Sequence, residues 1–272
     1  MTKICKLDHR IVVSISGRER LTFLQDLITN DVNKVTEEQA VYACLLTPQG
    51  KFLHDFLMLG DGERLLLDCE KDRAAGLVKA LKIYAMRAEV KITILEESCV
   101  YAIWDGDVEH SHMYCDPRHD DLGWRVLMLD GGDMEDTAEA SEYDMHRIAL
   151  AVPDGSRDMK PKLSTLLDHN IDLLNGISWD KGCYVGQEVT ARMRYRGLVK
   201  KRLIPVVVEE GKISQEAGAA IINEDGRNVG ELRSHAGAYA LVLMKLDAVN
   251  APVFLENQSL KIALPDYLQK NL

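Results

Sequence analysis

The segment 180–197 holds the residue types best suited to chemistry. Cys183 lies between Gly182 and Gly186, and Lys181 precedes it by two positions. Glycine leaves the backbone free to make a tight turn or to approach a ligand closely. From position 186 onward the residues favour a helix, so Cys183 precedes a helix N-terminus, where amide dipoles and the Lys181 ammonium both favour a thiolate. The spacing therefore predicts a reactive Cys183. The alternative is a glycine-flanked turn with a buried, inert thiol.

The predicted helix after Cys183 carries charges at helical spacing. Glu188, Arg192 and Arg196 recur every four residues and therefore line one face. Residues 181–202 hold seven bases and one acid. One interpretation is a solvated face with ion pairs, and the other is a site for an anionic ligand.

Two further charged residues are notable for their neighbours in the sequence. Asp55 lies between Leu53 and Leu57 in a strand-like segment, so strand alternation turns it toward the apolar side. A carboxylate there is costly unless it is paired, which favours a functional role. Arg147 lies in a predicted helix, where it is either a surface charge or a fork that clamps a ligand carboxylate.

Strands and helices are mixed over the first 197 residues and must position these side chains. A strand is predicted over 9–15, and Ser16 with Glu19 forms a capping box for a helix that ends at Asn30–Asp31. Further strands are predicted over 41–47, 51–59, 64–69, 90–94, 99–104 and 124–129, and helices over 74–87 and 139–150. This mixture predicts an α+β fold.

Past Gly197 the sequence holds closely spaced strand patterns without helical stretches. They cover residues 202–208, 218–222, 228–233, 239–244 and 259–263. Such a run predicts a small β-barrel or sandwich. We therefore divide the chain into a mixed α+β domain over 1–197, made of one part or two interleaved parts, and a C-terminal β-barrel over 198–272.

Composition excludes several classes of protein. The net charge of −10 disfavours direct nucleic-acid binding, which needs a positive surface against phosphates. The six cysteines form no C-x-x-C pair, so we predict neither a metal site nor a disulfide framework. The longest apolar run has seven residues, whereas a membrane helix needs about 20. The N-terminus lacks the apolar core of a signal peptide, and these observations together predict a cytoplasmic protein without membrane association.

The pattern K-G-C-Y-x-G-Q-E-x-x-x-R, followed by aromatic-x-G, resembles the signature of the YgfZ-like, folate-binding relatives of the glycine-cleavage T-protein. The resemblance extends from about residue 9 to about residue 263. Its other blocks are Thr29–Val32, Leu46–Lys51, Asp116–Arg118 with Leu122–Arg125, Arg147–Ile148 with Val152–Pro153, and Gly230–Leu241.

This resemblance implies a T-protein (GcvT)-like fold with tetrahydrofolate or a related reduced folate in a central cavity and a β-barrel beside it. It also implies a role in the assembly or repair of iron–sulfur proteins, with those proteins or their assembly factors as partners. The residues that match its site are Asp55, Arg125, Arg147, Asp168, Lys181, Cys183, Tyr184, Gln187, Glu188 and Arg192.

The chain departs from the T-protein pattern in three places. His54-Asp55 stands where those enzymes carry Asp-Asp, and Arg125 stands where they tend to have an acid. Upstream of the signature, Leu166 and Asp168 stand where many relatives have Pro and Glu.

Three functions remain open on this basis. The first is a folate-binding iron–sulfur assembly factor with Cys183 as the reactive residue. The second is a folate-dependent aminomethyltransferase or other one-carbon transferase, and the missing Asp-Asp pair disfavours it. The third is a tRNA-modification factor that binds RNA through 200–202. The net charge and an aromatic share of 6% count against that function, because RNA recognition commonly uses aromatic stacking.

Overall fold

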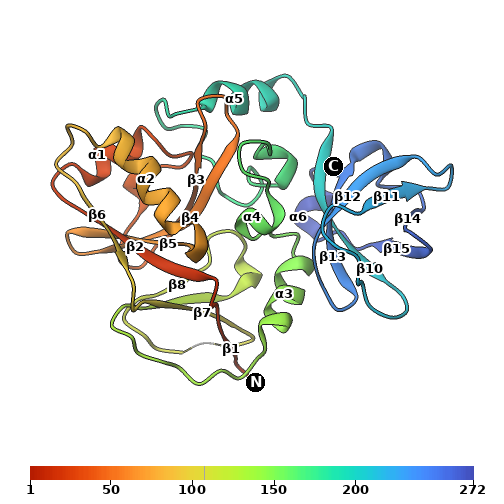
Figure 1. Cartoon of the computed structure of the whole chain (residues 1–272), viewed down its shortest axis with the longest axis horizontal. Helices are drawn as coiled ribbons and strands as arrows, with labels where there is room; N and C mark the ends of the chain where they lie inside the picture. Colours follow the sequence, from red (N-terminus) through yellow and green to blue (C-terminus); the bar gives the residue numbers. More distant parts are fainter. Residues whose placement is uncertain (107) are drawn as a thin grey trace. The chain divides into compact units, whose positions relative to one another are not determined.

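The computed structural model describes residues 1–106 and 108–272, and their contacts divide into two compact units. Unit 1 comprises residues 1–140 and 175–187, and unit 2 comprises residues 141–174 and 188–272. Figure 1 shows the course of the chain through both units.

Unit 1 contains a five-stranded antiparallel sheet covered on one face by two helices. The strand order is β3 (Val41–Leu46), β4 (Phe52–Asp61), β5 (Arg64–Glu70), β2 (Arg10–Ser16) and β6 (Lys91–Leu95). Helices α1 (Arg20–Gln25) and α2 (Ala74–Tyr84) pack on this sheet, and both lie beside it in Figure 1. Leu24 of α1 and Leu77 and Leu81 of α2 share one apolar core with alternate residues of the strands, as the period of two requires.

A second, four-stranded antiparallel sheet faces the other side of the first sheet. Its order is β1 (Lys3–Lys6), β7 (Cys99–Trp104), β9 (Trp124–Met128) and β8 (Met113–Cys115). The Tyr114 hydroxyl and the Arg125 guanidinium both donate to Asp68 of β5. A buried polar contact thus joins the two sheets.

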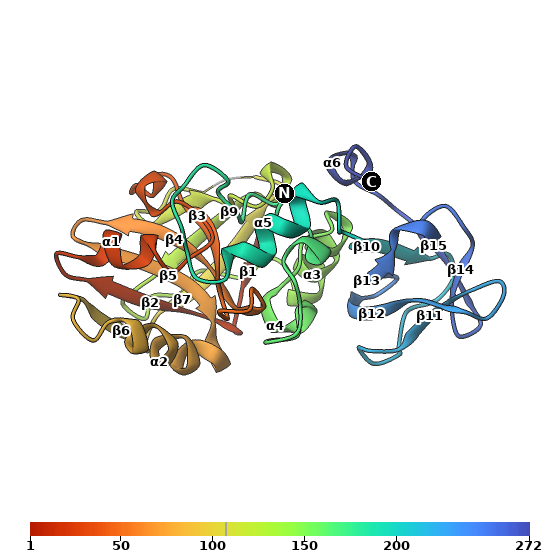
Figure 2. The ribbon, with the colours of Figure 1, turned by 90° about the horizontal axis from the view of Figure 1, so that it is seen from above.

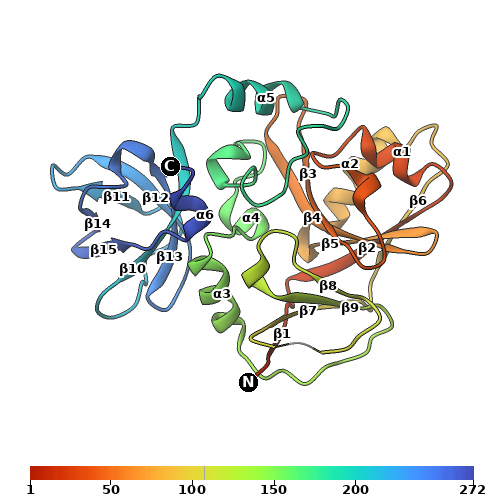
Figure 3. The same cartoon turned by 180° about the vertical axis from the view of Figure 1, so that it is seen from behind.

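Unit 2 is built around a closed antiparallel barrel, drawn in blue in Figure 3. Its order is β10 (Lys201–Val208), β13 (Tyr239–Lys245), β12 (Asn228–Ala236), β11 (Ala220–Asn223), β14 (Val253–Leu255) and β15 (Gln258–Ile262). The remaining helices are α3 (Ala140–Ala149), α4 (Gly155–Asp158), α5 (Gln187–Tyr195) and α6 (Asp266–Gln269). Single 3-10 turns lie at Val32–Lys34, Lys71–Arg73, Asp120–Leu122, Leu167–His169 and Leu246–Ala248. Ile148 of α3 belongs to the same apolar core as the barrel interior.

The α+β fold and the C-terminal barrel are confirmed. The two units do not follow the division drawn after residue 197, because residues 141–174 and 188–197 group with the barrel. The other differences from the sequence prediction are local. The predicted capping box is wrong: α1 begins after Glu19, whose carboxylate instead accepts a hydrogen bond from the Glu89 amide at 2.6 Å. That helix also ends at Gln25 rather than near Asn30. Strands β1, β8 and β14 were missed because three or four residues are too few to show alternation. Among the described residues, no helix is both long enough and apolar enough to cross a bilayer.

Candidate functional site

Cys183 is exposed on the loop that leads into α5. Cys5, Cys44 and Cys69 are buried, Cys99 is half-buried, and Cys115 is the other exposed cysteine. The structure therefore excludes the alternative of a buried thiol at position 183. Figure 2 shows this loop, coloured teal, running beside β3.

Lys181 fixes the first half of the loop. Its ammonium group donates to the carbonyl oxygens of Gln25 (2.6 Å), Ile28 (2.7 Å) and Asn30 (2.8 Å), at the end of α1 and in the turn after it. A cation at a helix C-terminus is favoured by the exposed carbonyls and the helix dipole. Burial lowers the pKa of Lys181 to about 8, opposed by the nearby Asp31 carboxylate. Lys181 thus anchors the loop, a different role from the expected support of a thiolate.

Gly186 fixes the second half of the loop. Its φ is +82°, and a Cβ atom there would lie 2.5 Å from the carbonyl oxygen of Thr47. The turn over Thr47–Gly50 therefore approaches the loop too closely for any other residue at position 186. The Val185 amide donates to the Asp26 carbonyl (3.2 Å), and the Gln187 side chain accepts from the Tyr184 amide (3.0 Å).

Thr29 and Asn30 hold the segment that precedes the loop. The Thr29 hydroxyl donates to the Gly176 carbonyl (2.6 Å), and the Asn30 amide side chain donates to the Asn175 carbonyl (2.7 Å). The Ser178 amide donates to the Thr29 carbonyl (3.0 Å). Asn30 is therefore more than a helix stop. Sequence blocks separated by over a hundred positions come together to position Cys183.

A pocket of about 470 Å³ borders residues 175–180 of this segment, entirely within unit 1. Trp179 is half-buried and supplies aromatic surface, and Lys34 is the single base among the described residues of the lining. The lining also includes Asn30, Glu38, Gln39, Ala40, Val41, Tyr42, Cys115, Asp116, Pro117, Asp120, Asn175, Ile177, Ser178 and Asp180. Its volume is typical of small-molecule sites. Sequence reasoning missed this pocket because its walls come from four separate stretches of chain.

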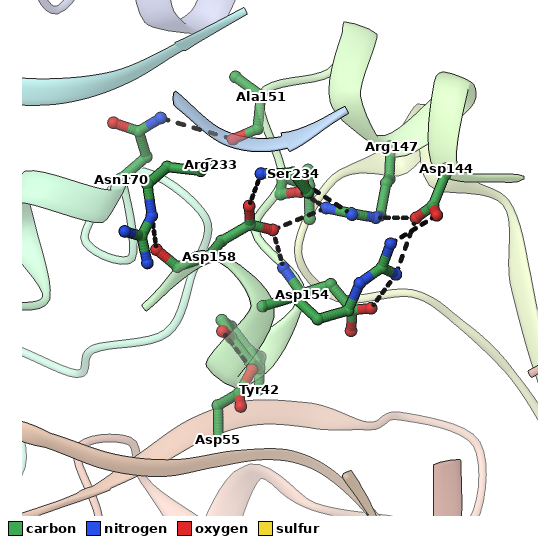
Figure 4. A network of polar contacts seen from close by, with 12 residues as sticks. Tyr42, Asp55, Asp144, Arg147, Ala151, Asp154, Asp158, Asn170, Arg233 and Ser234 are labelled. Carbon is green, nitrogen blue, oxygen red and sulfur yellow. Dashed lines mark hydrogen bonds and ion pairs between the residues drawn. The ribbon is translucent and has the colours of Figure 1, made fainter. Parts of the chain in front are cut away.

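Tyr42 connects the pocket to Asp55. Its hydroxyl donates to the Asp55 carboxylate at 3.0 Å, a contact visible in Figure 4, and both side chains are buried. The Arg118 guanidinium lies 5.7 Å from the centre of the Tyr42 ring. Burial, and then the Asp55 charge, raise the pKa of Tyr42 well above its usual value. Asp55 is therefore buried and paired, as its cost requires.

His54 faces the opposite side of β4 from Asp55. Its imidazole lies 3.5 Å from the position that a Cβ atom on Gly76 of α2 would take, under the helix layer. Burial lowers the pKa of His54 to about 4, assisted by the Arg73 charge. Because successive strand residues point to opposite faces, position 54 does not belong to the surroundings of Asp55. The His54 substitution is thus no argument against aminomethyl transfer.

Arg125 belongs to a buried charge network between the two sheets of unit 1. It donates to Asp68 at 3.0 Å and to Asp116 at 3.1 Å. Asp68 also accepts from Arg10 (2.6 Å), and Asp116 accepts from Arg118 (2.7 Å). Burial alone would raise the pKa of Asp116, but the charges of Arg118 and Arg125 hold it well below its usual range. Arg125 therefore holds the protein's own carboxylates, a structural role beside the ligand contact that the resemblance implies.

Arg147 is buried in a second network, in unit 2 (Figure 4). It donates to Asp144 (2.6 Å), Asp158 (2.9 Å), the Ser234 hydroxyl (2.9 Å) and the Val152 carbonyl (3.1 Å). The alternative of an exposed surface arginine is therefore wrong. The Arg147 guanidinium, which was expected to bind a ligand carboxylate, instead binds the carboxylates of Asp144 and Asp158.

The other residues carried over from the resemblance are more accessible. Asp168 is half-buried in unit 2 and accepts from the Thr165 hydroxyl at 2.5 Å. Glu188 and Arg192 are exposed on α5. Tyr184 is half-buried, with the Lys181 ammonium 5.4 Å from its ring centre. Lys181, Tyr184 and Gln187 thus share the loop of Cys183, and Lys181 and Gln187 hold its backbone.

Comparison with solved structures defines the class of fold. Over 98% of its length the chain matches the crystal structure of the glycine cleavage system aminomethyltransferase T from Bartonella henselae, covering 86% of that chain with a TM-score of 0.73. The identity is 14%, so the match shows the fold alone. Residues 200–270 match the family described as CAF17, C-terminal beta-barrel domain. The chain therefore has an aminomethyltransferase-like fold with a C-terminal six-stranded barrel.

Relatives identify the family. The chain is 34% identical over 228 residues to the IBA57 homolog of Mycosarcoma maydis, covering 75% of this chain and 57% of that protein. It is 29% identical to IBA57 of Homo sapiens (95% and 82%) and 30% identical to the homolog of Coccidioides immitis (90% and 71%). All three are named mitochondrial iron–sulfur cluster assembly factors. This chain belongs to the IBA57 family, to which YgfZ-like proteins are related.

The predicted cytoplasmic location is wrong. The relatives are mitochondrial proteins, and they point to the mitochondrion instead. The sequence argument considered only apolar signals, whereas mitochondrial targeting segments are amphipathic and rich in arginine. Lack of an apolar segment therefore does not favour the cytoplasm.

Proposed function

We propose that this chain acts in iron–sulfur cluster assembly, with Cys183 as its reactive residue. The observation that carries the proposal is the exposed thiol on a loop fixed at Lys181, Gly186 and Thr29. Membership of the IBA57 family supports the process, because its relatives are named for it.

The cluster is cargo in this proposal. Iron–sulfur clusters are commonly held by four thiolates. Cys183 supplies one, and among the described residues no group of three or more His, Cys, Asp or Glu side chains is placed to hold a metal ion. The other ligands therefore come from a partner, either an assembly factor or a recipient iron–sulfur protein.

Complementation with a matched cysteine control tests the reactive residue. Cells that lack their own IBA57 protein would receive the wild type, Cys183→Ser or Cys99→Ser, and mitochondrial iron–sulfur enzymes would be assayed. Cys99 is half-buried and lies outside the pocket lining, so its serine variant controls for the loss of a thiol elsewhere in unit 1. We expect Cys183→Ser alone to fail at normal protein level. Full rescue by Cys183→Ser would refute the role.

A reduced folate, tetrahydrofolate or a relative, is the proposed ligand of the pocket beside residues 175–180. The Trp179 ring suits a flat pterin, and the carboxylates of Asp120 and Asp180 can accept from its N–H groups. Lys34 can pair with a carboxylate of the glutamate tail. When bound, such a cofactor would supply one-carbon carrier chemistry.

Calorimetric titration with tetrahydrofolate tests this ligand. We expect saturable one-to-one binding that Trp179→Ala weakens about threefold to tenfold, the range for loss of an aromatic contact. Tyr195→Ala is the control, because Tyr195 is exposed and is not part of the pocket lining. Lack of binding at millimolar ligand would exclude folate without affecting the role of Cys183.

A further inference from the structure

A second concave site lies on unit 1 between α2 and the edge strand β6. It has a volume of about 660 Å³. Its lining consists of Ala75, Val78, Lys79, Lys82, Ile83, Met86 and Ile94. Six of these residues belong to α2 or directly follow it, at positions that share one helical face. Figure 1 shows α2 beside the sheet that β6 closes.

This face makes α2 apolar on two sides. Leu77 and Leu81 already bury the inner face of the helix against the sheet. The outer groove leaves Ile83 64% and Met86 86% exposed. Single exposed apolar residues are ordinary, but large ones gathered in a groove mark an interaction site.

The groove is basic on an acidic chain. Residues 71–91 hold six Lys or Arg and two acids, although the whole chain has a net charge of −10. Lys79 and Lys82 line the groove itself, and α2 contains no acid. A partner that fits both features is apolar along one face and negatively charged beside it.

We propose that this groove binds an acidic amphipathic helix of a partner protein. The face from Ala75 to Met86 is about 16 Å long at 1.5 Å per residue, which is three turns. Apolar side chains at i, i+3 or i+4, and i+7 of the partner helix enter between α2 and Ile94. Flanking Asp or Glu residues pair with Lys79 and Lys82.

Charge and shape argue against two other occupants. In a two-fold pair of identical chains, the same patch meets itself, so Lys79 and Lys82 would face their own copies. A membrane surface is flat and does not fill a groove.

Seven lining residues are few beside the 20–30 per side of a stable interface. A site of this size fits a transient complex. Such binding suits a protein that must meet and release its partner.

Two synthetic peptides on the full-length chain test the proposal. One is a helix of about four turns with Leu along one face and Glu on its flanks, and the other replaces each Glu by Lys. Fluorescence anisotropy should show micromolar binding of the Glu peptide and at least about tenfold weaker binding of the Lys peptide. Met86→Glu should weaken the binding of the Glu peptide at least about tenfold. Leu163→Glu is the control, because Leu163 is a 68% exposed apolar residue outside the groove, and it should leave the affinity for the Glu peptide unchanged. Lys79→Glu with Lys82→Glu should reverse the preference, and Lys261→Glu with Lys270→Glu, both at exposed positions, should not.

Each other outcome overturns the proposal. Equal affinity for both peptides would show that the lysines do not select the partner. No binding of either peptide would show that the groove does not bind a helix. Flotation with phosphatidylcholine–phosphatidylserine vesicles that is lost in Met86→Glu would assign the face to a membrane. A concentration-dependent dimer that Met86→Glu dissociates would assign it to a second copy of this chain.

Discussion

Replacing Gly186 by alanine should release the Cys183 loop from the body of unit 1. Two costs follow from the structure. A φ of +82° costs a non-glycine residue about 1–2 kcal/mol. The added Cβ would lie 2.5 Å from the Thr47 carbonyl oxygen, and relieving such an overlap costs about 1–3 kcal/mol. The strain of about 2–5 kcal/mol falls on a short loop, so we expect the loop to detach before the sheet unfolds.

Alanine substitutions at two other glycines of the same region separate the backbone cost from the steric cost. Gly197 has φ +58°, and among the described residues no atom lies within 4 Å of its added Cβ, so Gly197→Ala carries the backbone cost alone. Gly182 has no positive φ and equally open surroundings within the described chain, so Gly182→Ala should be nearly neutral.

Hydrogen exchange and denaturation together read the outcome. In Gly186→Ala the Val185 amide, which donates to Asp26, should exchange at least about tenfold faster, because 1.4 kcal/mol corresponds to tenfold. The denaturation midpoint of Gly186→Ala should fall by less than a loss of the full strain energy in stability would give, because the detached loop relieves part of the strain. Wild-type exchange at Val185 in Gly186→Ala would refute the close approach to Thr47. Equal effects of all three alanines would also contradict it.

Three further perturbations have signed outcomes. The pKa of His54 is 6.5 in the unfolded chain and about 4 in the folded one, so the unfolded chain binds this proton more readily. The free energy of unfolding should therefore fall by about 3 kcal/mol as the pH drops from 6.5 to 4. His54→Gln should flatten this decline, measured as the urea midpoint at each pH. Arg125→Met should lower the free energy of unfolding in urea by about 3–5 kcal/mol, because Asp68 and Asp116 stay buried with one partner fewer. An unchanged urea midpoint would contradict the buried network. Lys181→Met removes the half-buried ammonium group that anchors the loop. It should lower the free energy of unfolding by about 1–2 kcal/mol and speed the alkylation of Cys183. An unchanged alkylation rate would show that the loop stays in place without Lys181.

Local patterns in the sequence predicted the elements and the importance of Cys183. Glycine spacing around the thiol marked a turn, and alternation marked most strands, because both signals need only neighbouring residues. Alternation could also have separated His54 from Asp55, since adjacent strand residues point to opposite faces.

Burial and long-range partners were beyond this reasoning. An arginine that clamps a ligand and one that holds a buried aspartate are the same residue type, so Arg125 and Arg147 could not be distinguished in advance. The carbonyls that Lys181 caps are about 150 positions away and have no side-chain signal at all. The pocket beside Trp179 likewise exists only once separate stretches have met.

The interleaved course of the chain has a consequence for the order of folding. Residues 175–187 complete unit 1 only after residues 141–174, which belong to unit 2, have been synthesised. Until Lys181 leaves the ribosome, the carbonyl oxygens at the end of α1 lack their cap, and Thr29 and Asn30 lack their partners. No N-terminal fragment that stops before this segment can present Cys183. The thiol is therefore displayed in its anchored form only by a chain whose first unit is already whole.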